Sequence, residues 1–220
     1  MLLMRRCLRS PAVITNTAGG GGRAAPVRWF SSGAAPPPRE LAHVVKLDSL
    51  HQETPERISQ LWIDYHVKKE ACVSAVAPAA TYALINRRLA ESPLFVLPLP
   101  RESGFVSVLL QAHAEQDTVM FTELEQYQRA ADKSAVPSCL HLRYYTDLAA
   151  TKDIVLVRGE VDLARLTTTE AQTLVNQLQV YYLADAKYAA VKTFNHDPAQ
   201  FDYNAIIDDL RGGVGTDTVR

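Results

Sequence analysis

Three segments of the chain repeat apolar residues at helical spacing. The first begins at Thr54-Pro55-Glu56, where a capping residue, a proline suited to the first helical position and an acid favour a helix start. The second covers residues 79–90 and the third residues 168–184. One apolar stripe on each predicts a helix with one buried face. The stripes comprise Ile58, Leu61, Trp62 and Tyr65; Tyr82, Ile85 and Leu89; and Ala171, Leu174, Val175, Leu178, Tyr181 and Tyr182.

Between the second and third helices the pattern becomes strand-like. Five strands are predicted, at residues 94–99, 105–111, 118–122, 138–145 and 154–161. The first two form a hairpin, and Pro98 lacks the amide that a central strand needs, so we expect a bulge or a strand end there. Short links without a helix between every pair predict an α+β domain. It has a mainly antiparallel sheet of about five or six strands, with helices packed on its dry face.

Other segments have weaker patterns. Residues 123–131 are predicted to form a short helix, and Asp197-Pro198 to begin a last helix that ends near Leu210. Residues 71–77 are too short, and residues 187–195 too weakly patterned, to assign. We therefore expect a single folded domain over residues 40–210 and a disordered tail over residues 211–220.

The first 39 residues differ in composition from the rest. They hold six arginines, no lysine and no acid, which leaves 17 basic against 24 acidic residues from Glu40 onward, a net charge of −7. An Arg-rich, acid-free start predicts a mitochondrial presequence followed by a disordered linker, and a location in the matrix. Arg28-Trp29-Phe30-Ser31-Ser32 resembles a matrix-processing pattern with the cut after Phe30. The alternative is an ordinary disordered basic tail.

Charge and hydropathy exclude two classes of function. Phosphate would repel an acidic body, so we expect no nucleic-acid partner. The longest apolar stretch, at residues 94–99, is far shorter than the roughly 20 residues of a membrane span. The glycine run at residues 19–22 lacks the Gly-Lys-Ser/Thr of a phosphate loop. Because no Cys/His spacing suits a metal either, we expect no cofactor.

Cys139 and His141 offer one possible enzyme site. They lie two apart on a predicted strand and share a face with Tyr145, so they are candidates for a nucleophile and a base in a small matrix enzyme. Strand residues two apart are only about 7 Å apart at the backbone, and nothing nearby completes a triad. A half-buried strand face accounts for them better.

The helix at residues 168–184 is the most informative for function. No charged residue occurs from Ala171 to Ala184. Uncharged amides cost less to dehydrate than charges, and interface cores are depleted of charge. We therefore predict a partner-facing surface there, and expect glutamates at Gln172 and Gln177 to weaken binding while leaving the fold intact. The alternative is cover by the chain's own C-terminal segment. The polar face consists of Gln172, Thr173, Asn176, Gln177 and Gln179.

A second candidate surface lies at residues 121–127. Phe121, Leu124 and Tyr127 recur at every third position beside Glu123 and Glu125. Ordinary packing of a short helix onto the sheet is the alternative. Residues 158–160 are predicted to be structural, with the glycine admitting a close approach and the flanking Arg and Glu pairing.

Six segments, in order and spacing, resemble the family of mitochondrial ATP synthase assembly factor 1. The first is Leu61-Trp62-Ile63-Asp64-Tyr65-His66, and the others are residues 93–101, 121–128, 144–148, 154–160 and 170–172. The resemblance covers about residues 44–205. It implies an assembly chaperone, not an enzyme, that binds the free catalytic beta subunit until the alpha subunit replaces it, and that is a monomer when free. A permanent accessory subunit is the remaining alternative.

Overall fold

The computed structural model describes residues 40–102 and 104–213, so the predicted leader lies outside it. A six-stranded antiparallel sheet has the order β1-β6-β5-β4-β3-β2. The strands are β1 Cys72–Pro78, β2 Leu94–Arg101, β3 Gly104–His113, β4 Thr118–Glu123, β5 Leu140–Tyr145 and β6 Ile154–Val161. The helices are α1 Leu47–His51, α2 Pro55–His66, α3 Ala79–Glu91, α4 Leu124–Arg129, α5 Ala149–Lys152, α6 Thr168–Leu183, α7 Asp185–His196 and α8 Tyr203–Gly213. The single α+β domain is confirmed.

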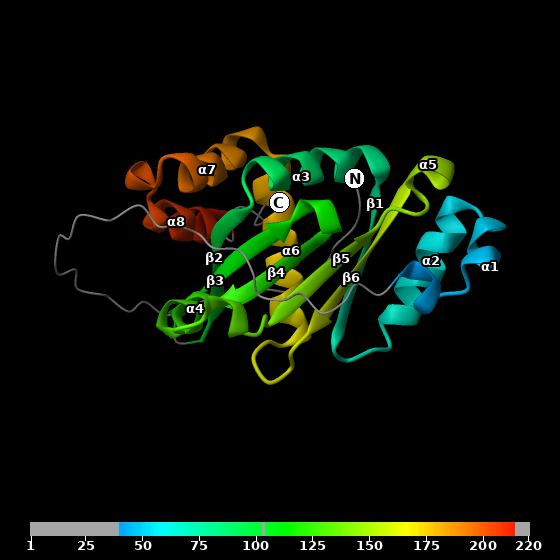
Figure 1. Cartoon of the computed structure of the whole chain (residues 1–220), viewed down its shortest axis with the longest axis horizontal. Coiled ribbons are helices and arrows are strands. Elements are labelled where there is room, and N and C mark those ends of the chain that lie inside the picture. Colours follow the sequence, from blue (N-terminus) through cyan, green and yellow to red (C-terminus); the bar gives the residue numbers. More distant parts are fainter. Residues whose placement is uncertain (1–39, 103, 214–220) are drawn as a thin grey trace, which may run out of the picture.

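The first face of the sheet carries the main core. Alternate residues of each strand point to it, among them Phe95, Phe121 and Leu142, all fully buried. The helices α3 and α6 pack on this face, and α7 and α8 close it near β2. Figure 1 shows α6 passing behind the strands, with α3 and α7 along the upper border.

The second face is covered at its two ends. At the β1–β6 end, Trp62 of α2 is buried beside Tyr145 and its indole N–H donates to the Val157 carbonyl oxygen at 3.0 Å. At the other end, Tyr127 of α4 packs on Val96. Figure 1 shows α2 at the right-hand end of the sheet and α4 at its lower left. The expectation of cover on one face alone was therefore wrong, because the second face is also apolar at its ends.

Three details differ from the predicted elements. Pro98 pairs in continuous register with Ser107, with no bulge or strand end, because β2 is an outer strand and needs no second ladder. The sequence assigned no element to two segments that are regular in the structure. Residues 71–77 form most of β1, and residues 187–195 form most of α7. The last helix starts at Tyr203 after a short 3-10 turn and includes the first three residues of the predicted tail.

Candidate interaction surface

Local hydrogen bonds define the start of α6. The Thr167 hydroxyl accepts from the Glu170 backbone N–H at 3.1 Å, and the Glu170 carboxylate accepts from the Thr167 N–H at 2.7 Å. This capping box satisfies N–H groups that a helix start leaves free. The six stripe residues of α6 are all buried, as predicted.

The amide face of α6 is divided by the fold. Gln177 is only 7% exposed, and its Nε2 donates to the Pro98 carbonyl oxygen at 2.9 Å, so it is an internal contact of the chain. Gln172, Asn176 and Gln179 remain partly exposed, and Gln172 Nε2 donates to Asn176 Oδ1 at 3.2 Å. Of the predicted amide residues, these three keep a side chain at the surface.

The second predicted surface, at residues 121–127, places its rings inward. Phe121 is fully buried in the main core, and Tyr127 is buried against Val96 and Leu109. Leu124 is partly buried beside them. Phe121 and Tyr127 are therefore unavailable to a partner in this fold, and the alternative of ordinary helix packing describes the segment.

The strand β1 forms a sheet edge that the sequence did not predict. Its seven residues carry no charge, and among the described strands it pairs with β6 alone. The Val161 N–H donates to the Ala71 carbonyl oxygen and the Ala79 N–H to the Asp153 carbonyl oxygen, both at 3.1 Å. In an antiparallel ladder, alternate residues turn their backbone groups the same way. The N–H and C=O groups of Ser74 and Val76 therefore point away from β6.

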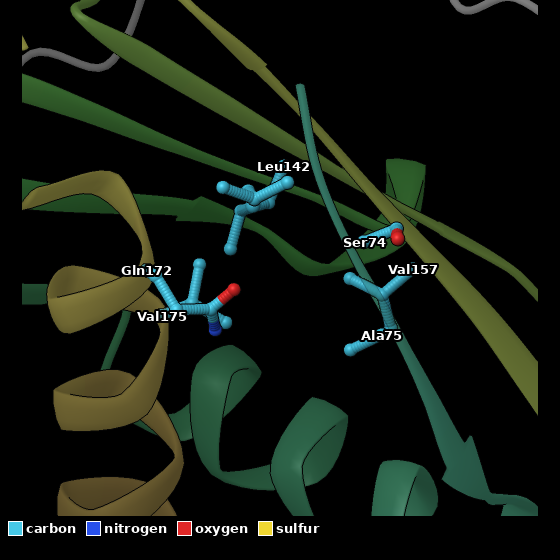
Figure 2. A pocket seen from close by; sticks show the side chains of 7 residues that line it. Ser74, Ala75, Leu142, Val157, Gln172 and Val175 are labelled. Carbon is cyan, nitrogen blue, oxygen red and sulfur yellow. The ribbon is translucent and has the colours of Figure 1, made fainter. Parts of the chain in front are cut away.

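A shallow depression adjoins this edge, too small to admit a water molecule. Figure 2 shows Gln172 and Val175 projecting from α6 on one side of it, and Ser74 and Ala75 on β1 at the other. We call Ser74, Val76, Gln172 and Asn176 the edge surface. It offers outward backbone groups and side-chain amides with no charge, a combination that suits a polypeptide partner. Seven uncharged residues closed by a proline were the only sequence signal for its β1 half.

The geometry does not favour the enzyme alternative. Cys139 is fully buried among core residues and its Sγ donates to the Phe121 carbonyl oxygen at 3.2 Å. Burial raises the pKa of this thiol to about 12, so it is protonated at neutral pH. His141 is half-buried near Glu160 and Arg143, and burial lowers its pKa. Within residues 40–102 and 104–213, no three His, Cys, Asp or Glu side chains gather as metal ligands.

Comparison with known proteins decides the family. The family model described as ATP11 protein matches residues 20–207. The chain belongs to the ATP11 family. The match begins inside the segment predicted to be a leader, earlier than the resemblance seen in the sequence. Across the described residues, no helix is long and apolar enough to cross a membrane.

Named relatives agree with this assignment. The chain is 33% identical over 180 residues to ATP synthase mitochondrial F1 complex assembly factor 1 of Danio rerio, covering 80% of this chain and 58% of the relative. The human protein of the same name is 34% identical over 182 residues, with 81% and 54% covered. Protein atp11, mitochondrial, of Schizosaccharomyces pombe is 27% identical over 148 residues, with 66% and 51% covered. The chain thus spans little more than half the length of these relatives.

Proposed function

We propose that this chain is an assembly chaperone of the mitochondrial ATP synthase F1 complex and performs no catalysis. It binds the free beta subunit in the matrix, prevents its aggregation, and releases it when the alpha subunit binds. Membership of the ATP11 family, together with relatives named as F1 assembly factors, is the observation that carries this proposal.

The edge surface gives the proposal a physical basis. A subunit that awaits its neighbour exposes apolar surface, and such surface aggregates. Uncharged amides and backbone groups on the chaperone can pair with polar backbone groups exposed at the border of that surface, and no unpaired charge is buried. A contact of this kind is also easily displaced, because neutral hydrogen bonds exchanged for water contribute little net free energy.

An aggregation assay tests the proposal. Isolated beta subunit is incubated at a temperature where it precipitates, with and without the purified chain, and light scattering is followed. We expect near-stoichiometric chain to suppress the scattering, and added alpha subunit to release beta into an alpha–beta complex. Isolated alpha subunit alone serves as the control client. Equal precipitation of beta with and without the chain would refute the function.

A further inference from the structure

The β2 edge of the sheet is closed to further strand pairing. The Ala112 N–H donates to the Pro93 carbonyl oxygen, so the odd-numbered residues of β2 direct their backbone groups toward β3. The even-numbered residues direct their backbone N–H and C=O groups away from the sheet. At Leu94 both outward groups bond to the Asn195 side chain, at 3.1 Å and 2.6 Å. Pro98 and Pro100 have no N–H, and the Pro98 carbonyl oxygen accepts from Gln177. Prolines and capping side chains are devices that prevent unwanted strand addition.

Among the described residues, the β1 edge is unprotected at Ser74 and Val76, although Pro78 at the end of the strand has no N–H. In the part of the chain that the structure describes, the outward N–H and C=O groups of Ser74 and Val76 bond to no other group. Both residues are partly exposed, and no charged side chain interrupts the strand. An uncharged edge with free donors and acceptors two residues apart is a template for another extended chain.

We propose that β1 receives an extended, uncharged segment of the client as a seventh strand of the sheet. Backbone groups of Ser74 and Val76 pair with the segment, as in other cases of strand addition. Gln172 of α6, which lies beside this edge, offers its side-chain amide to the segment. The identity of the client as the beta subunit rests on the proposed function.

A second copy of this chain is a poorer occupant. Pairing of two β1 strands would set Ser74, Ala75 and Val76 against equally short side chains, which bury little apolar surface. The edge is also uncharged, so a strongly acidic or basic peptide would lose hydration without gaining a counter-charge. An extended segment without charge matches this uncharged edge.

Amide hydrogen exchange tests the pairing in the unmodified chain. In the free chain we expect the Ser74 and Val76 amides to exchange rapidly, and those of Val73 and Ala75, which face β6, to exchange slowly. Bound to isolated beta subunit, Ser74 and Val76 should slow at least tenfold. A complex that forms without this slowing overturns strand addition and leaves the chaperone function standing. Failure to form any complex overturns both.

Protection of Ser74 and Val76 that grows with the concentration of the chain alone would also overturn the proposal, in favour of self-pairing. A substitution provides an independent test. Ser74→Pro removes one outward N–H and leaves the β6 ladder complete, so we expect at least tenfold weaker binding of beta subunit with a similar melting temperature.

The matched control is Ser74→Ala, which loses the hydroxyl but keeps the outward N–H, and which should bind beta subunit within threefold of the original chain. Equal loss in both variants, with both folded, would overturn the pairing through the Ser74 N–H. Where Ser74→Pro does not fold, the exchange measurement decides.

Discussion

At the scale of single residues, Gly159 is the position in β6 where no side chain fits. A Cβ atom there would lie 2.5 Å from Val73 Cγ2 and 2.7 Å from Leu142 Cδ2. The close approach predicted for this glycine is therefore made by packed side chains. We expect Gly159→Ala to lower the free energy of unfolding by about 1–3 kcal/mol, because the core is overpacked, as measured by urea denaturation.

Two further variants control for Gly159→Ala. A Cβ at Gly212 in α8 meets nothing within 4 Å, so Gly212→Ala should change stability by no more than about 0.5 kcal/mol. Adding Val73→Ala to Gly159→Ala removes the clashing methyl, and the double variant should lose less stability than the two single losses summed. Unaltered stability of Gly159→Ala would show that the strands separate easily there.

Gln177 and Gln172 should respond differently to the same change. Gln177→Glu loses the donor to the Pro98 carbonyl oxygen and buries a carboxylate, so we expect a loss of about 2–4 kcal/mol in thermal or urea unfolding. Gln172→Glu, at a partly exposed site, should stay within about 0.5 kcal/mol. The sequence alone predicted an intact fold for both. If Gln177→Glu melts at the same temperature as the original chain, the expectation of an intact fold holds for both variants.

At the scale of elements, α6 depends on its capping box. Thr167→Ala removes the hydroxyl that accepts from the Glu170 N–H, and we expect a loss of about 1 kcal/mol in the free energy of unfolding. Thr167→Ser keeps the hydroxyl and should retain most of the stability. If both substitutions cost the same, the hydroxyl is not the stabilising group.

The elements that the sequence predicted well are specified by residues close together in the chain. The helix α2 has a cap, an N-terminal proline and an apolar stripe of which Ile58 and Trp62 are buried, although Tyr65, predicted to share that face, is exposed. The helix α6 has a capping box and six buried stripe residues. By contrast, β1 is short and gains its identity from pairing with β6, more than 75 residues later in the chain. The helix α7 buries only Tyr188 and Val191 fully, which leaves too weak a periodic signal.

The candidate surface was predictable only in part, for the same reason. The absence of charge on α6 marked Gln172 and Asn176 from the sequence alone. The sequence could not show that Gln177 reaches Pro98, 79 residues away, because that contact depends on how α6 crosses the sheet. Nor could it show which strands lie at the edges, which is a property of topology.

At the scale of the whole molecule, the two sheet faces differ in polarity. The first is apolar throughout, whereas the second has apolar ends under α2 and α4 and polar residues between them. His66 and His141 belong to this second side, at the α2 interface and on β5. Burial lowers the pKa of both imidazoles. The folded chain therefore binds their protons less readily than the unfolded chain.

This difference makes stability depend on pH. Below the unfolded histidine pKa of about 6.5 the unfolded chain takes up protons that the folded chain resists, so the free energy of unfolding falls as pH falls. We expect a loss of about 1 kcal/mol or more between pH 7.5 and pH 5.5, measured by urea denaturation at constant ionic strength. The carboxylates with lowered pKa contribute mainly at lower pH; they are Glu56, Asp132, Glu170 and Asp209.

Substitution of His66 assigns part of that loss. His66 Nδ1 lies 2.8 Å from the Trp62 carbonyl oxygen, and Asn in its place can offer an N–H to the same oxygen without titrating. We expect His66→Asn to flatten the pH dependence, whereas His51→Gln, at an exposed site on α1, should leave it unchanged. If the profile of His66→Asn is as steep as that of the original chain, the buried imidazole is not the group that links proton uptake to unfolding.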